Sequence, residues 1–353
     1  MITFNRMYMT NFVCHFVGNK ELGESIQKTD KEFEFQDDST KNTMLEYLIS
    51  GFKGDIYYQF KEKDFSTYNV LTYIEGIFTD KDRFVEYSKN IANLLYSNTI
   101  HPKILGGELY IVYMKDAECD GEICDAIGIF KSETIDKFIK MEIVPSINSN
   151  TNESKIITDS GCGIDKLDKG ALIFNTDKNN CYKISIINKS KKPEDVTYWE
   201  DFLDIKLKKN GYFYTNHALN QAISFCDEVL TSENNVGKID QMSVLNRSIN
   251  FFKNNDVFTE DEFKQQVLNN EEIVVAFDEH KRQYEKLTNI EIEKEFDISK
   301  IAVKDKNKYS KGIIKLDKNF QIHINSRHDL IEKGYDDEKA MGFYKVYFIH
   351  ENM

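Results

Sequence analysis

Short stretches that are apolar throughout, or that alternate apolar with polar residues, recur along the first half of the chain. They predict β-strands at residues 12–17, 32–35, 138–144, 171–174 and 182–187. Residues 43–52 and 82–96 instead carry apolar side chains at helical spacing, and the polar stretch 148–155 predicts a loop. Strands that follow one another with helices at their flanks are typical of a largely antiparallel sheet packed against helices.

The longest strand pattern predicts a hairpin. Residues 108–118 and 122–130 are strand-like and are joined by Asp120-Gly121, a dipeptide that readily adopts the positive φ angles of a tight turn. The chain therefore reverses direction here and pairs with itself.

The second half of the chain changes character after the charged, proline-containing segment 188–195, where we predict a domain boundary. Residues 199 to about 305 are helical in pattern, and Thr259 with Glu262 forms a capping box that opens the helix containing Phe263 and Val267. Strands return at 312–316, 320–324 and 343–349. The fold class is α+β: an N-terminal mixed domain, 1–190, with a mainly antiparallel sheet and flanking helices, then a mostly helical domain, 196–353, that ends in β-strands.

Composition narrows the class of protein. The 353 residues are 41% hydrophobic, enough to fill a sizeable core, and the formal net charge of -13 disfavours nonspecific coating of DNA or acidic membranes. About 18 consecutive apolar residues would be needed to span a bilayer, and neither such a run nor a signal-like N-terminus occurs, so we expect a cytoplasmic protein with no membrane contact. Six cysteines without a Cys-x-x-Cys pair argue against zinc and against a disulfide framework, and no metal or cofactor is expected.

Three groups of residues invite a catalytic interpretation. Clustered carboxylates at Asp116, Glu118, Asp120, Glu122 and Asp125 could bind Mg²⁺ in a metal-dependent nuclease, but a solvated hairpin tip is the favoured explanation. The His101-Pro-Lys stretch before Gly106-Gly107 could hold a phosphate, but we favour a segment that ends a helix and turns the chain into the sheet. Cys162 between two glycines could be a nucleophile, but no base is identifiable, and a loop cysteine is favoured.

Trp199 is the lone tryptophan, and it is expected to anchor the core of the helical domain rather than to stack on a base.

One segment runs against the acidic charge of the whole chain. Between residues 299 and 320 there are seven lysines but only two acids, Asp305 and Asp317, and Tyr309 lies among the lysines. Such lysines can line phosphates while an aromatic ring packs beside a sugar or base, and they can equally protect the edge of a hairpin. The candidate nucleic-acid-binding residues are Lys300, Lys304, Lys306, Lys308, Lys311 and Lys315. Arg247 is a second candidate, which we expect to pair with a neighbouring acid instead.

Ordered sequence blocks carry a family resemblance. They are His15-Phe-Val-Gly-Asn-Lys20, the stretch 101–133, Leu167-Asp-Lys-Gly-Ala-Leu-Ile-Phe-Asn175, Leu245-Asn-Arg-Ser-Ile-Asn-Phe-Phe-Lys253 and Gly312-Ile-Ile-Lys-Leu-Asp-Lys-Asn-Phe320. Together they make the chain similar to the bacterial nucleoid-associated family known as NdpA or YejK, over essentially its whole length.

The resemblance implies a function that the residues alone do not. It implies a nucleoid protein without enzymatic activity of its own, which binds DNA directly or engages DNA-management proteins such as type II topoisomerase subunits. By analogy with architectural DNA proteins, a homodimer would let two weak basic patches act with greater avidity. A metal-dependent nuclease using residues 116–125, and a non-catalytic interaction subunit of a larger assembly, remain the alternatives.

Overall fold

The protein forms two compact units, Met1–Lys208 and Lys209–Met353. The computed structural model describes residues 2–52, 56–61, 68–145, 152–164, 167–189, 193–234, 236–306, 312–316, 320–324 and 330–350. The α+β fold class is confirmed. The predicted domain division, 1–190 and 196–353, stays a prediction, although the helix and strand that follow the predicted break lie inside the first unit.

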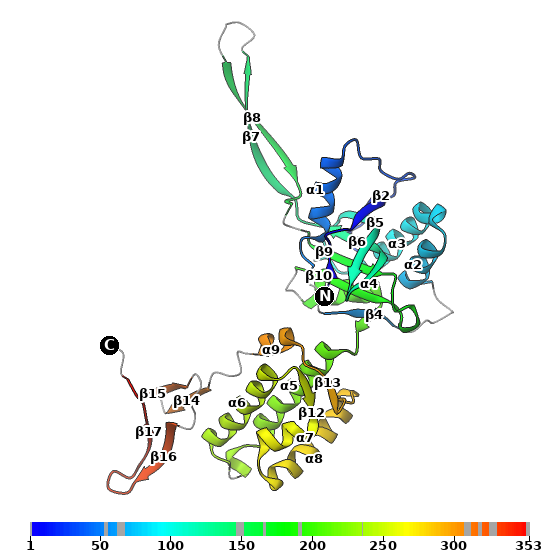
Figure 1. The fold of residues 1–353 in the computed structure, drawn as a ribbon. Coiled ribbons are helices and arrows are strands. Elements are labelled where there is room, and N and C mark those ends of the chain that lie inside the picture. Colours follow the sequence, from blue (N-terminus) through cyan, green and yellow to red (C-terminus); the bar gives the residue numbers. More distant parts are fainter. Residues whose placement is uncertain are drawn as a thin grey trace. The chain divides into compact units, whose positions relative to one another are not determined.

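The first unit is built on one antiparallel sheet (Figure 1). In the described part of the chain its order is β11-β4-β10-β9-β6-β5-β2-β3, and β1 pairs with β5. The bounds are β1 Ile2–Thr3, β2 Tyr8–Val17, β3 Ile26–Gln27, β4 Tyr58–Phe60, β5 Gly107–Cys119, β6 Glu122–Ser132, β9 Lys169–Phe174, β10 Lys183–Asn188 and β11 Ile205–Leu207. The predicted hairpin is confirmed: Cys119 pairs with Glu122, and the two turn residues have φ angles of 52° and 83°.

Helices cover both faces of this sheet. Helix α1 (Asp38–Ile49) packs on one face, while α2 (Val70–Thr79), α3 (Phe84–Asn98) and α4 (Pro193–Leu203) pack on the other. Side chains alternate between the faces along each strand. Ile111 and Ile129 therefore join the core beneath α2 and α3, whereas Val112 and Phe130 join the core beneath α1. Burial on both faces explains why the central strands read as continuous apolar runs.

Strands β7 (Asp136–Pro145) and β8 (Asn152–Gly161) form a separate two-stranded ribbon that extends from the first unit (Figure 1). The predicted strand 138–144 is confirmed. The predicted loop 148–155 is wrong for residues 152–155, because these residues are the first part of β8 and pair with β7.

The second unit is mainly helical, as predicted. Its long helices enclose an aromatic core that includes Phe225, Phe252 and Phe277. Its helices are α5 Gly211–Glu228, α6 Lys238–Asn254, α7 Glu260–Phe263, the π-helical turn η4 Lys264–Leu268, α8 Glu271–Thr288 and α9 Lys300–Lys306. The strand pairs are β12 Val257–Thr259 with β13 Glu295–Asp297, β14 Gly312–Leu316 with β15 Phe320–Ile324, and β16 Ile331–Asp336 with β17 Met341–Val346. No described helix is both long and apolar enough to cross a membrane.

Some local predictions are wrong. Residues 32–35 are not a strand; Phe33 and Phe35 instead pack edge-on against Phe12 of β2, so their alternation reflects an aromatic cluster. Thr259 occupies the N-cap of α7 as expected, but its hydroxyl makes no capping hydrogen bond. Trp199 is buried, as predicted, but in the sheet-and-helix core of the first unit and not in the helical core.

Candidate nucleic-acid interface

The lysine segment, by which we mean the lysines between residues 299 and 320, begins on the short helix α9. Ala302 and Val303 face the core and fix this helix on the second unit. Lys304 is exposed and Lys306 is half-buried on the same helix. Lys308 and Lys311 lie outside the described residues. Lys315 lies opposite Gln321 in the β14–β15 pair, and its side chain is likewise outside the described part.

Lys300 has structural partners. Its ammonium lies 3.0 Å from the Asp256 carboxylate and also donates to the main-chain carbonyls of Lys253 and Asn255, at the end of α6. These bonds tie the start of α9 to α6. Lys304 and Lys306 are therefore the described members of the segment best placed to meet a phosphate.

Lys306 lies close enough to influence a histidine in α5. Burial lowers the pKa of His217, and the positive charge of Lys306 lowers it further. His217 is thus neutral near pH 7 and adds no charge to this surface.

Arg247 is part of the helical packing. Its Nε donates to the Val267 carbonyl at 2.8 Å, and its Nη1 lies 3.1 Å from the Ser243 hydroxyl. The partners seen in the described part of the chain are thus a carbonyl and a hydroxyl, not the acid that we expected. Arg247 holds the π-helical turn η4 against α6.

Four of the five carboxylates of the β5–β6 hairpin, those of Glu118, Asp120, Glu122 and Asp125, accept hydrogen bonds from other side chains of the protein. Asp120 accepts a hydrogen bond from Tyr57 at 2.9 Å and pairs with Lys183 at 2.8 Å. Burial by itself would raise the pKa of Asp120, but these contacts lower it to about 2. Glu118 accepts from Thr3, and Asp125 accepts from Tyr113 at 2.5 Å.

These bonds favour the turn interpretation of the acidic group over the metal-site interpretation. Across the described residues, no three or more His, Cys, Asp or Glu side chains are placed to hold a metal ion. Divalent cations would have to displace the donors already bound to these carboxylates.

The turn before β5 is held by Asn19, a buried residue that follows the end of β2. Asn19 Nδ2 donates to the carbonyls of His101 and Ile104, at 2.9 and 2.6 Å. Gly107 lies so close to the Ser132 carbonyl that a Cβ would be 1.9 Å from its oxygen. Close packing of the strands thus requires glycine at position 107. The interpretation of the segment before β5 as a turn explains its residues.

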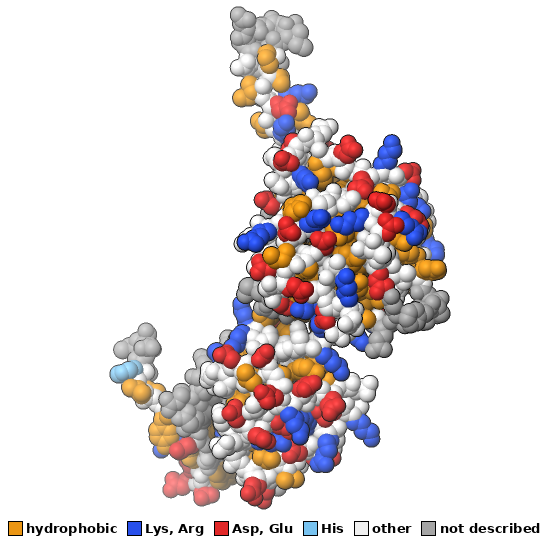
Figure 2. Space-filling view, turned by 45° about the vertical axis from the view of Figure 1, so that its right-hand side comes forward, with side chains coloured by type: hydrophobic (Ala, Val, Ile, Leu, Met, Phe, Trp, Pro, Cys, Tyr) orange, Lys and Arg blue, Asp and Glu red, His pale blue; other side chains and the backbone are white. Residues whose placement is uncertain are grey.

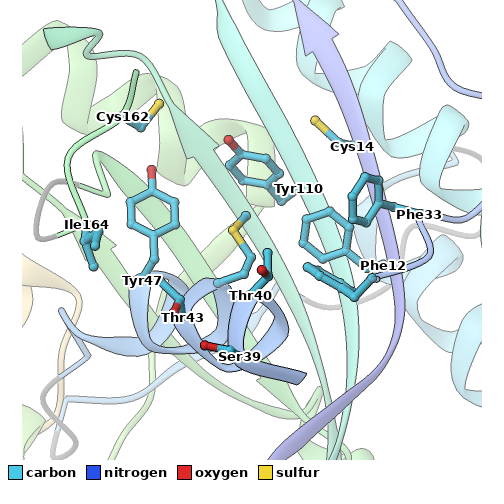
Figure 3. A pocket seen from close by; sticks show the side chains of 12 residues that line it. Phe12, Cys14, Phe33, Ser39, Thr40, Thr43, Tyr47, Tyr110, Cys162 and Ile164 are labelled. Carbon is cyan, nitrogen blue, oxygen red and sulfur yellow. The ribbon is translucent and has the colours of Figure 1, made fainter. Parts of the chain in front are cut away.

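Cys162 lines an apolar pocket of about 530 Å³ between α1 and the sheet, shown in Figure 3. The Ser132 hydroxyl lies 2.9 Å from its sulfur. Across the pocket, burial raises the pKa of Cys14 to about 11, and nearby Glu108 adds to the shift. Cys14 is therefore a protonated thiol at neutral pH and does not have the setting of an activated nucleophile.

A buried ionic cluster escaped the sequence interpretation. Lys131 of β6 and Lys169 of β9 are directly opposite in the register, and both are essentially fully buried. Glu133 bridges them: its carboxylate lies 2.9 Å from the Lys131 ammonium and 2.5 Å from that of Lys169. The signal in the sequence was a lysine at the end of one apolar run, Lys131, and a lysine at the start of another, Lys169.

Buried polar residues occur in three of the sequence blocks named above. His15, Asn19, Lys131 and Lys169 lie in these three blocks, and all are buried in the first unit. These residues of the blocks therefore belong to the fold of the first unit and not to its exposed surface.

Comparison with known families gives one result. The sequence model of the family described as nucleoid-associated protein YejK matches residues 13–341. A search of curated proteins finds no match.

Proposed function

The chain belongs to the family described as nucleoid-associated protein YejK, and we propose that it acts in the bacterial nucleoid as a non-enzymatic protein that contacts DNA through the lysine segment. The observation that carries this proposal is the family match over residues 13–341. The lysine segment is its best-supported contact because it is locally basic in a chain of net charge -13.

The distribution of surface charge supports a local contact. Lys and Arg side chains are interspersed with Asp and Glu on the face that Figure 2 shows. Such a surface attracts a polyanion only where lysines outnumber acids. On α9, Lys304 and Lys306 flank the single acid Asp305.

A second route to the nucleoid is a protein partner. The overall negative charge repels duplex DNA at a distance, and this favours association through DNA-management proteins such as type II topoisomerase subunits. Both routes place the chain in the nucleoid, and they differ in what survives removal of DNA.

The test is affinity purification of the tagged full chain from lysate with and without nuclease. Direct contact predicts that nuclease removes most co-purified material and that Lys304→Glu with Lys306→Glu removes it without nuclease. Lys286→Glu with Lys294→Glu is the matched control, since it makes the same charge change at exposed positions of the same unit. A partner route predicts instead a discrete protein that remains after nuclease. Recovery of neither DNA nor a discrete protein would contradict nucleoid association.

A further inference from the structure

The β7–β8 ribbon is long, regular and uncovered. Its ten residue pairs run without a register shift from Asp136 opposite Gly161 to Pro145 opposite Asn152. Neither strand pairs with another described strand. A two-stranded hairpin by itself is only marginally stable in water, so such a ribbon usually gains stability from something packed on it.

The two faces of the ribbon differ in chemistry. Residues directly opposite each other share a face, and successive pairs alternate between faces. The central pairs of one face carry Ile139, Met141, Ile143 and Ile156 with Thr158 and Ser154, and the same face ends in the pairs Lys137 with Ser160 and Pro145 with Asn152. We call these four apolar residues the apolar face of the arm.

The apolar face is open to solvent. The exposed fractions are 70% for Ile139, 66% for Met141, 76% for Ile143 and 65% for Ile156. Hydrophobic side chains are visible on the surface of this hairpin in Figure 2. A contiguous apolar patch of this kind on a projecting element is typical of a protein–protein contact.

Most charges of the arm lie on the opposite face, which also carries Phe138 and Ile157, whereas Lys137 lies at the end of the apolar face. The pairs Lys140 with Ile157 and Glu142 with Lys155 alternate with the apolar pairs, and Lys140 lies 2.6 Å from Glu142. The two strands together contain four acids and three lysines, so the arm has no excess of positive charge to attract DNA phosphates.

A second copy of the chain fits this surface. The three central pairs of this face carry only apolar and hydroxyl side chains, so two copies can pack them about a two-fold axis without burying a charge, with Lys137 left at the margin of the contact. Two bodies of net charge -13 repel each other. A ten-residue strand spans about 33 Å, several times the screening length of about 8 Å at physiological salt, so contact at the arms lets the bodies stay apart.

We propose that β7 and β8 form a dimerisation arm, in which the apolar face of one copy packs against the same face of a second copy. The dimer forms without DNA. It presents two lysine segments to one duplex, which would strengthen binding through avidity.

The first experiment measures the mass of the full chain by sedimentation equilibrium over a range of concentrations, in DNA-free buffer. The triple variant Ile139→Thr, Met141→Thr, Ile143→Thr keeps residues that suit strands but removes the apolar face. We expect a wild-type dimer and at least about tenfold weaker association of the variant, since each buried aliphatic group contributes to the contact. The control Lys140→Thr with Glu142→Thr changes the opposite face and should dimerise like the wild type.

The second experiment places a single new thiol on each face, so that it does not depend on the stability of the triple variant. Met141→Cys at the centre of the apolar face should give a covalent dimer under mild oxidation. Lys140→Cys should behave like the wild type with its native cysteines.

Several outcomes would overturn the arm proposal. They are a wild-type monomer throughout the concentration range, a triple variant that dimerises normally, or equal cross-linking of the two cysteine variants. A monomeric wild type whose DNA binding is lost in the triple variant would assign the arm to DNA instead. None of these mass measurements involves DNA, so their failure leaves the proposed nucleoid function standing.

Discussion

At the scale of single residues, the first unit contains buried polar side chains held by specific hydrogen-bond partners. His15 is the clearest case. Its Nδ1 accepts from the Thr29 amide at 3.1 Å, and its Nε2 lies 3.0 Å from the Ser88 hydroxyl, which in turn donates to the Val85 carbonyl. This pattern requires the neutral ring with its proton on Nε2.

The buried ring gives the stability of this unit a pH dependence. Burial lowers the pKa of His15 to about 4, helped by the positive charges of Lys89 and Lys28. The unfolded chain binds a proton near pH 6.5, so stability is constant above that pH and falls as the pH drops to about 4. The loss from this residue is on the order of 3 kcal/mol.

His15→Gln should remove this dependence, because the variant has no group that titrates in that window. The measurement is urea unfolding of wild type and variant at pH 7 and pH 4.5. The difference in the free energy of unfolding between the two proteins should be smaller at pH 4.5 than at pH 7. An exposed histidine variant, His350→Gln, should track the wild type at both pH values, and a gap for His15→Gln that stays constant would contradict the neutral-ring account.

At the scale of elements, the register between strands β6 and β9 explains why the sheet contains a buried negative charge. The β6–β9 register sets Lys131 opposite Lys169, an arrangement that is unfavourable unless a negative charge lies between them. Glu133 supplies that charge, and Asp168 accepts from its main-chain amide at 2.7 Å. The sheet therefore depends on one glutamate that is distant in sequence from one of its partners.

Glu133→Gln should destabilise the first unit by about 3–5 kcal/mol, because it leaves two buried ammonium groups without their counter-charge. The surface pair offers a matched control: Glu142→Gln, which removes the partner of exposed Lys140, should cost less than about 1 kcal/mol. Thermal and urea unfolding of both variants measure the two costs. Equal, small losses would show that the cluster carries no net electrostatic stabilisation.

Local pattern predicted much of the fold at this scale. The β5–β6 hairpin, helices α1 and α3, and the strands β9, β10, β14 and β15 are present where periodicity and turn chemistry placed them. Strand β8 was missed because its partner, not its own composition, makes it a strand. Helix α2 was missed although its buried residues Val70, Leu71, Ile74 and Ile77 have helical spacing. Trp199 was assigned to the wrong core because sequence position does not reveal which unit a helix packs on.

The candidate site was less predictable than the fold. The lysine segment could be found because its charge departs from that of the chain. The geometry of the segment could not be predicted, because Lys300 pairs with Asp256 and nothing in the sequence indicates that these two parts of the chain lie together. The Lys131–Glu133–Lys169 cluster was hidden for the same reason, because only the register of two strands brings it together.

At the scale of the whole molecule, the acidic net charge limits how a protein of this family can reach DNA. A member of a nucleoid-associated family with a net charge of -13 has to reach DNA through a local patch or a partner. The lysine segment is the patch that we propose, and the proposed arm would let two such patches act together. Both can be tested in the purified full chain.

The most direct measurement is the binding of purified protein to duplex DNA over a series of salt concentrations. Each phosphate contact adds about 0.9 to the slope of log affinity against log salt concentration. We predict salt-sensitive binding by the wild type, a slope lower by about 2 for Lys304→Glu with Lys306→Glu, and an unchanged slope for the control Lys286→Glu with Lys294→Glu. Binding by the double variant with the affinity and slope of the wild type would contradict direct contact through the lysine segment.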